Sequence, residues 1–359
     1  MLPYKSTTVN NFDEYLITFL NKADNRIAQL LERSKKMRNG GEKVQKVKAD
    51  LEDRFPGAKI YFYGTRFMQL GHDKSHLNAF MELENSYWFT QKPEKIEKLM
   101  EEVQQYFKSE LEKNKISEKQ KDKNKLSVKQ EEIMPSELWT KPLNLLKTPV
   151  PTVRVTLRKN LQFDLTFSSG LGVENTKLIH HMFSLQPEAF KIYHFARIWI
   201  HIEEFRFKRY VVALLVLFFL QKHKFMPSVV MMQENVEKNC IGPWNVAFNK
   251  QKGIKDYGLE SITDYKEHFV DFFDFYSTFD FRKNVICPYL GREVPIKSYP
   301  TKEPELNNYA EDIKNFLFAD VNISEPFNLN FNVAYNVGKK RLQKFIPFCA
   351  HAVNLLENY

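Results

Sequence analysis

The chain has 359 residues, a formal net charge of +9 and a hydrophobic content of 43%, with only 12 Gly and 16 Pro. This length can supply two cores of ordinary domain size, and this composition excludes a chain that is mostly disordered. Its three cysteines are too few and too widely spaced for a disulfide scaffold or a zinc motif.

We expect an intracellular protein, nuclear or cytoplasmic, with no membrane anchor. Met1–Lys5 lacks the apolar core of a secretory leader. The longest apolar run, Val211–Leu220, is too short to cross a bilayer and is expected to form a buried helix. The basic charge has two interpretations, because it attracts nucleic-acid phosphates but is also common on solvated surfaces. RNA is therefore a possible partner.

The first strand–turn–strand pattern lies near residue 60. Lys59–Tyr63 is predicted to be a strand that leads into a turn at Gly64–Thr65, whose backbone N–H groups are suited to holding phosphate. A second strand is predicted from Leu77 to Leu83. Because strand side chains alternate between faces, His76 and Asn78 point the same way.

A low-complexity stretch and two further strands follow. Residues 110–132 mix Lys, Glu, Gln, Asn and Asp without any aromatic residue, which predicts an extended helix tip or a flexible insertion. Val153–Leu157 and Gln162–Phe167 alternate as strands, with Asp164 in the second. A helix is expected after the turn at Asn175–Thr176.

The rest of the chain is predicted to be mainly helical. One helix carries Arg197 and another carries Tyr210. The aromatic residues of 271–280 recur at helical spacing, which is more typical of a core stripe than of a stacking platform for bases. Glu325–Ala334, which contains Phe331, precedes a final helix.

These segments resemble the nucleotidyltransferase family of noncanonical poly(A) polymerases and terminal uridylyltransferases, over nearly the whole chain. The family pattern of Gly-Ser, a short Gly-containing loop and Ser-Asp-x-Asp is similar to Gly64-Thr65 followed by Ser75-His76-Leu77-Asn78. Glu325–Ala334 resembles the family signature Asp-Pro-Phe-x-x-x-His-Asn-Val-Ala. Where the family has two aspartates, this chain has His76 and Asn78, so it resembles a degenerate, pseudoenzyme-like member.

The resemblance implies an α+β fold with two domains. A nucleotidyltransferase domain with a mixed β-sheet is expected at 54–184, with the flexible charged insertion at about 110–132. Residues 1–53 and 185–359 are expected to form the helical central domain typical of poly(A) polymerases.

The resemblance also assigns site positions. The remnant catalytic positions are His76, Asn78 and Asp164, of which only Asp164 is a carboxylate. The vestigial nucleotide-binding positions are Gly64, Thr65, Ser75, Asn175, Arg197, Tyr210 and Phe331. Arg197 stands where the family has a phosphate-contacting lysine, and Tyr210 stands at a base-stacking position. Phe331 replaces a histidine that helps uridylyl members select the base.

The residue types at these positions argue against metal-dependent chemistry. Two-metal nucleotidyl transfer needs anionic oxygen ligands around two Mg²⁺ ions, and His76 and Asn78 remove two charges. Glu82 lies on the same face as Asn78 but roughly 13 Å along the strand. His76 with Asp164 gives only two ligands, fewer than zinc or manganese sites normally have. We therefore expect no metal and no cofactor.

Three functions remain open at this point. A scaffold that engages a protein partner predicts an exposed apolar patch. An RNA-binding module without transfer chemistry predicts salt-dependent affinity for RNA 3′ ends. A residually active terminal uridylyl- or adenylyltransferase needs Mg²⁺ and a substitute ligand such as Asp73. The sequence favours the first two functions over the third and does not rank the first two.

Overall fold

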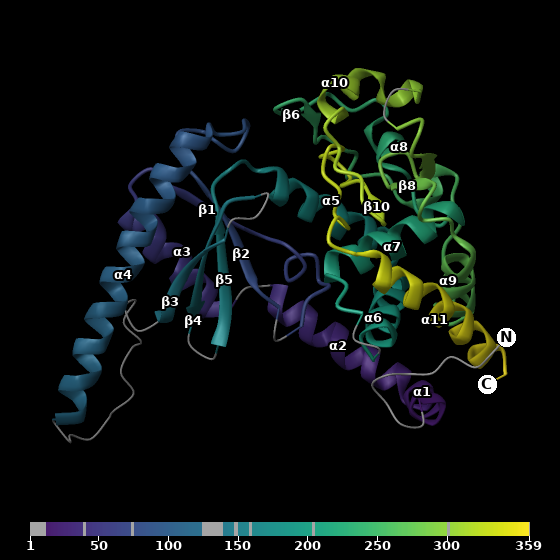
Figure 1. Ribbon diagram of the computed structural model, residues 1–359, viewed down its shortest axis with the longest axis horizontal. Helices are drawn as coiled ribbons and strands as arrows, with labels where there is room; N and C mark the ends of the chain where they lie inside the picture. Colours follow the sequence, from purple (N-terminus) through teal and green to yellow (C-terminus); the bar gives the residue numbers. More distant parts are fainter. Residues whose placement is uncertain are drawn as a thin grey trace. The chain divides into compact units, whose positions relative to one another are not determined.

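The computed structural model describes residues 12–38, 41–72, 75–123, 139–146, 150–157, 160–202, 205–299 and 302–358. The chain divides into two compact units, whose elements are drawn in Figure 1. The palm unit is Ser34–Thr176, and the helical unit combines Met1–Arg33 with Lys177–Tyr359. Each unit is described by itself.

The palm unit is built on a five-stranded sheet in the order β1-β2-β5-β4-β3. Its strands are β1 (Lys59–Tyr63), β2 (Leu77–Glu82), β3 (Trp139–Leu146), β4 (Thr152–Leu157) and β5 (Leu161–Thr166). Strands β2 and β5 pair in parallel, and every other neighbouring pair is antiparallel. The sheet is therefore mixed, as expected from the sequence.

Two helices, α3 (Gly41–Arg54) and α4 (Pro93–Lys123), supply the apolar side chains that cover this sheet. Val44, Val47 and Leu51 recur every three or four residues along α3 and are buried in the same cluster as the strand residues. Each such side chain contributes about 1.5–3 kcal/mol when it is fully buried. The palm unit therefore begins at Ser34, upstream of the domain boundary expected at 54.

The charged stretch expected at 110–132 falls partly on α4. The helix continues to Lys123, which agrees with an extended helix tip for the first part of the stretch. The remainder, 124–132, lies outside the described residues.

The helical unit contains mainly helices and two small sheets, of two and three strands. Its helices are α1 (Phe12–Asn21), α6 (Pro187–Ile202), α7 (Arg209–Lys222), α8 (Val229–Gln233), α9 (Glu267–Thr278), α10 (Ala310–Ile313) and α11 (Lys339–Glu357), and α2 (Ala23–Arg38) and α5 (Leu171–Leu185) contribute residues to both units. Its strands are β6 (Cys240–Ile241), β7 (Trp244–Asn245), β8 (Asn284–Cys287), β9 (Arg292–Pro295) and β10 (Asn322–Ile323). Among its described residues it also contains the 3₁₀ helices η3 (Ile254–Tyr257) and η4 (Pro304–Tyr309).

Helix α7 is the centre of the helical unit. All eleven residues from Val211 to Gln221 are buried, as expected for a helix that is apolar on every side. The Tyr276 hydroxyl of α9 donates to the Leu215 carbonyl of α7 at 2.7 Å. Phe272, Phe273 and Tyr276 are buried, so the aromatic stripe of α9 is core, as the sequence predicted.

The irregular segment before α11 is held by one buried side chain. Asn332 Nδ2 donates to the carbonyl oxygens of Leu317 and Val321, and its Oδ1 accepts the N–H groups of Ile323 and Ala334. A single buried amide therefore fixes the loop that contains Phe331. In the part of the chain that the structure describes, no helix is long and apolar enough to span a bilayer.

Candidate functional site

The three remnant catalytic positions come together on the palm sheet. Asn78 of β2 and Asp164 of β5 are direct partners in the parallel register. His76 lies one residue before β2, and its Nδ1 is 3.0 Å from Asp164 Oδ2. The His76 side chain is 41% exposed, whereas that of Asp164 is only 12% exposed.

Asp164 has a second partner, Arg154, which lies directly opposite on β4. Arg154 Nε donates to Asp164 Oδ1 at 2.5 Å, and Arg154 Nη2 donates to Asp164 Oδ2 at 2.7 Å. This is a bidentate guanidinium–carboxylate pair, the strongest common form of charge-assisted hydrogen bonding. Both oxygens of the one remaining catalytic-position carboxylate are therefore engaged by the chain itself.

These contacts keep Asp164 ionised. Burial acts to raise the pKa of its carboxyl, but hydrogen bonds from Arg154 and His76, together with their charges, outweigh burial and hold the pKa below its usual value. The Asp164 hydrogen bond in turn raises the pKa of the Arg154 guanidinium. The pair is therefore a fixed cation and a fixed anion at neutral pH.

The residues at this site do not fit two Mg²⁺ ions. A metal would have to displace Arg154 from Asp164, and the neighbouring Asn78 offers only a neutral amide. Glu82 is engaged elsewhere, since it accepts the Tyr61 hydroxyl at 2.8 Å. Among the described residues, no group of three or more His, Cys, Asp or Glu side chains is arranged to hold a metal. Asp73 lies outside the described residues.

The turn at Gly64 is shaped by its neighbours in the palm unit. Gly64 has φ +88°, and a Cβ at this position would lie 2.6 Å from Asn78 Nδ2. Only glycine fits both the left-handed backbone and this close approach. The Gly64 N–H donates to Thr176 Oγ1 at 2.8 Å, and the Thr65 carbonyl accepts the Leu70 N–H. The Gly64 N–H that was expected to hold phosphate is therefore bonded within the protein.

Two other predicted binding residues make bonds within the palm unit. Ser75 Oγ accepts the His72 N–H at 2.8 Å. Asn175 is 1% exposed, and its Nδ2 donates to the Leu171 carbonyl at 3.2 Å. Helix α5 starts at Leu171, so Asn175 lies in its second turn and not in the turn before the helix that the sequence predicted. Both side chains stabilise local structure.

The remaining predicted binding residues, Arg197, Tyr210 and Phe331, belong to the helical unit. Burial lowers the pKa of the Arg197 guanidinium, whose Nε has no hydrogen-bond partner among the described residues. The Tyr210 hydroxyl is buried and lies near Glu325. Burial raises the pKa of the Glu325 carboxyl to about 7. The Phe331 ring lies 6.2 Å from the Tyr335 ring.

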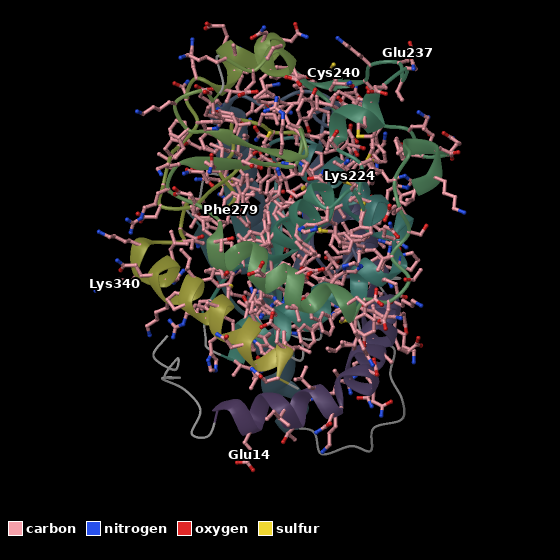
Figure 2. The ribbon with its side chains drawn as sticks, turned by 90° about the vertical axis from the view of Figure 1, so that its right-hand side faces the viewer. Glu14, Lys224, Glu237, Cys240, Phe279 and Lys340 are labelled. Atoms are coloured by element: carbon pink, nitrogen blue, oxygen red, sulfur yellow. The ribbon has the colours of Figure 1, made fainter. Side chains whose placement is uncertain are left out.

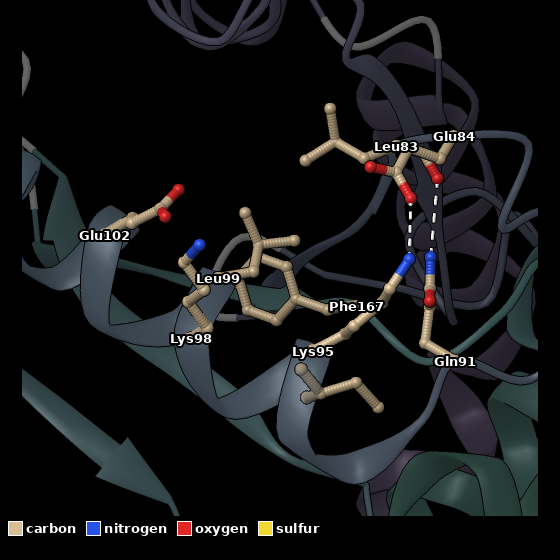
Figure 3. A pocket seen from close by; sticks show the side chains of 9 residues that line it. Leu83, Glu84, Gln91, Lys95, Lys98, Leu99, Glu102 and Phe167 are labelled. Atoms are coloured by element: carbon tan, nitrogen blue, oxygen red, sulfur yellow. Dashed lines mark hydrogen bonds and ion pairs between the residues drawn. The ribbon is translucent and has the colours of Figure 1, made fainter.

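A groove of about 210 Å³ lies beside the start of α4 in the palm unit. Leu83, Leu99 and Phe167 provide its apolar lining, and the exposed ion pair between Lys95 and Glu84, at 2.8 Å, lies on its rim (Figure 3). The loop between β2 and α4, which contains Glu84, also carries Trp88 and Phe89, each 45% exposed. Exposed aromatic residues of this kind are typical of binding surfaces.

Arg154 is the functional residue that was not singled out in the sequence. The signal was available in the hairpin: Leu157 pairs with Leu161, and counting outward from this pair places Arg154 opposite Asp164. Strand alternation alone predicts which face a residue lies on, but only the register predicts its partner.

The mixed palm sheet carries Asn78 and Asp164 on its adjacent interior strands β2 and β5, with His76 beside them. This sheet, together with a helical unit in the same chain, defines a nucleotidyltransferase-type protein. Residues 21–184 match the family described as poly(A) RNA polymerase, mitochondrial-like, central palm domain, and residues 266–331 match the Cid1 family of poly A polymerases. The first match spans the palm unit and the second lies in the helical unit, so both units resemble poly(A) polymerases of these families. The fold predicted from the sequence is confirmed.

Solved structures of the family share this fold. A crystal structure of mtPAP in complex with CTP has a TM-score of 0.68 at 16% identity, covering 93% of this chain and 68% of that chain. A structure of the Cid1 poly(U) polymerase has a TM-score of 0.64 at 14% identity, covering 90% and 89%.

Two curated relatives are each 24% identical to this chain. The Danio rerio "Speckle targeted PIP5K1A-regulated poly(A) polymerase" is 24% identical over 345 residues, which is 86% of this chain and 42% of that protein. The Xenopus tropicalis protein of the same name is 24% identical over 211 residues, 54% of this chain and 24% of that protein. The chain thus spans less than half the length of these two relatives.

Proposed function

We propose that this chain binds RNA 3′ ends through a nucleotidyltransferase fold and does not extend them. The observation that carries the proposal is the state of Asp164, which accepts hydrogen bonds on both oxygens from Arg154 and contacts His76. Two-metal transfer requires carboxylates that are free to hold cations. Here a fixed guanidinium neutralises the one carboxylate that remains at the three positions.

RNA as the ligand is supported by the family and by charge. The relatives bear names of enzymes that polymerise A or U, whose acceptor is an RNA 3′ end. A net charge of +9 favours phosphate binding through release of counterions. The speckle-targeted relatives support a nuclear location, and a cytoplasmic one remains the alternative.

A protein partner is a further part of this proposal, and Trp88 and Phe89 support it. Both side chains are 45% exposed on one loop of the palm unit, and aromatic residues are enriched in protein interfaces. Cross-linking of wild type and of Trp88→Ala/Phe89→Ala in cell extract tests this part. Loss of one defined cross-linked protein in the variant supports it, and an unchanged cross-linking pattern opposes it.

A second candidate function is an active terminal RNA nucleotidyltransferase. The comparisons favour it more directly than they favour inactivity, because the similar proteins are named as polymerases. The geometry at Asp164 favours the first candidate. Mg²⁺ would be required only for this second function.

Primer extension combined with RNA binding separates the two functions. A labelled RNA with a 3′-hydroxyl end is incubated with each nucleoside triphosphate in turn and with Mg²⁺ or Mn²⁺. In parallel, anisotropy of the same RNA is measured in EDTA at rising salt. We expect binding that weakens with salt and no extension.

Two outcomes of these experiments would contradict the first function. Extension by wild type that disappears in Asp164→Ala would establish the second function and overturn the first. No binding at low salt would overturn RNA recognition itself. Asp164→Asn, with a neutral side chain of nearly the same shape, is the matched control for the loss of charge.

A further inference from the structure

The helical unit has a pocket that is separate from the predicted nucleotide-binding positions. It has a volume of about 260 Å³ and lies between α8, the β6–β7 hairpin and η4. Figure 1 shows α8, β6 and α10 gathered at one end of this unit, and Figure 2 shows Glu237 and Cys240 at the end opposite to Glu14. Pockets for drug-sized ligands are typically about 300–1,000 Å³, so this one suits a smaller group.

One wall of the pocket is aromatic. Tyr309 packs against Trp244 with ring centroids 5.5 Å apart and an interplanar angle of 31°. The Tyr289 ring stands perpendicular to Tyr309 at 6.0 Å. Trp244 and Tyr289 are buried, whereas Tyr309 keeps part of its surface exposed. Packing therefore holds Tyr309 in place at the pocket surface.

A second wall presents a buried amide with a fixed orientation. Asn245 is only 7% exposed, and its Oδ1 accepts the N–H groups of Asn239 and Ala247 at 3.1 and 3.2 Å. These two bonds assign Oδ1 and direct Nδ2 away from them. The Nδ2 group makes no hydrogen bond to any described residue, and Asn245 lines the pocket. This donor pair lies at the pocket surface, where an acceptor on a ligand can take the place of water.

Two further side-chain amides, those of Gln233 and Asn308, line the same pocket. Gln233 is oriented by donating Nε2 to the Asn245 carbonyl at 2.8 Å, which leaves its Oε1 on the side of the Tyr289 hydroxyl, 3.5 Å away. Asn308 is exposed and offers both a donor and an acceptor. The charges on the rim, Lys238 and Glu234, are of opposite sign. A site for phosphate alone is disfavoured by Glu234, whereas a planar group with polar edges is favoured.

We infer that this pocket binds one unpaired base of a single-stranded RNA. Bases in single strands are recognised by stacking on aromatic side chains and by hydrogen bonds to their edges, which Tyr309 and the Asn245 and Asn308 amides supply. A base also offers an acceptor to Asn245 Nδ2, and Lys238 lines the pocket for the adjoining phosphate. This inference rests on the proposed RNA-binding function and adds a base contact to it.

Binding of oligo-U, oligo-C, oligo-G and oligo-A to the full chain, measured by anisotropy in EDTA, tests the inference. Tyr309→Ala removes the stacking surface, and we expect roughly tenfold weaker binding. Asn245→Asp keeps the oxygen that accepts two backbone N–H groups and replaces the free donor with an anionic oxygen, so we expect a similar loss. Asn308→Ala changes an exposed side chain and weakens binding without affecting folding.

Asn307→Ala is the matched control, because Asn307 is exposed next to Asn308 and does not line the pocket. Wild-type binding that persists unchanged in Tyr309→Ala, Asn245→Asp and Asn308→Ala overturns the pocket assignment and leaves RNA binding intact. No wild-type binding overturns both. Displacement of RNA by an uncharged oligoglycine peptide, but not by uridine or guanosine, assigns the pocket to a protein ligand and also overturns the inference.

Discussion

Arg154 and Asp164 face each other across β4 and β5 and are joined by two hydrogen bonds, of 2.5 and 2.7 Å. The carboxylate at the third catalytic position is therefore part of an internal ion pair. The chain combines the family fold with a site in which the Arg154 and His76 side chains lie where metal ions would need free carboxylates. If the two aspartates alone were missing, restoring them would be enough to restore the site. The Arg154–Asp164 pair predicts a different result.

Restoring the two missing aspartates is expected to be insufficient by itself. In His76→Asp/Asn78→Asp, Arg154 still occupies both oxygens of Asp164. Adding Arg154→Thr, which keeps a β-branched strand residue, frees Asp164 for Mg²⁺. Primer extension should therefore detect Mg²⁺-dependent tailing in the triple variant and much less in the double variant. Equal tailing by the two variants would show that Arg154 does not block the site.

Removing Arg154 alone is expected to destabilise the palm unit. Arg154→Met leaves a largely buried Asp164 carboxylate with only His76, at a cost of roughly 1–3 kcal/mol, less than for a fully buried pair because the Arg154 side chain is 28% exposed. Urea unfolding measures this change.

The matching double variant, Arg154→Met/Asp164→Asn, should be less destabilised than the sum of its single variants. Lys95→Met removes the exposed ion pair with Glu84 and serves as the control, with a change within about 0.5 kcal/mol. Additive behaviour of the Arg154 and Asp164 variants would contradict a coupled pair.

Acid should weaken the palm unit through Asp164. The folded-state pKa of this carboxyl is held below its ordinary value, so its stabilising contribution is complete above about pH 4 and is lost as the pH falls through the lowered value. Urea unfolding over this acid range should lose less stability in Asp164→Asn than in wild type. Glu101→Gln, exposed on α4, should behave as wild type. The same acid dependence in wild type and Asp164→Asn would exclude this role.

The helical unit should show the opposite pH dependence through Glu325. Burial raises the folded-state pKa of this carboxyl to about 7, so its contribution is complete below its ordinary value and is lost as the pH rises through 7. Glu325→Gln, which stays neutral, should be more stable than wild type at alkaline pH by roughly 1–2 kcal/mol and equal to it below about pH 4. The midpoint of thermal unfolding measures this difference. Glu311→Gln, on an exposed side chain, is the control and should show no alkaline gain.

Strand periodicity in the sequence predicted much of the palm unit. Alternation placed His76 and Asn78 on one face, and the structure places both beside Asp164. The Asp164–Arg154 pair was also within reach, because a short hairpin fixes its own register. The buried α7 helix followed from its apolar run alone, whereas the fold class followed from the resemblance to the nucleotidyltransferase family.

Contacts between distant segments were not predictable in this way. The Gly64 N–H bonds to Thr176, which is more than a hundred residues away, and no local pattern anticipates that partner. The pocket near Asn245 was also not predictable from local patterns, because its residues come from α8, the β6–β7 hairpin and η4. The orientation of the Asn245 amide depends on two backbone N–H groups that only the folded loop brings together.

Manganese binding tests most directly whether Asp164 is withheld from metal. Mn²⁺ is titrated into wild type, Asp164→Asn and the triple variant His76→Asp/Asn78→Asp/Arg154→Thr, and bound ion is followed by electron paramagnetic resonance. We expect wild type and Asp164→Asn to bind equally little Mn²⁺ and the triple variant to bind it at this site. Stoichiometric binding by wild type that is lost in Asp164→Asn would contradict the ion-pair interpretation and would favour an active transferase.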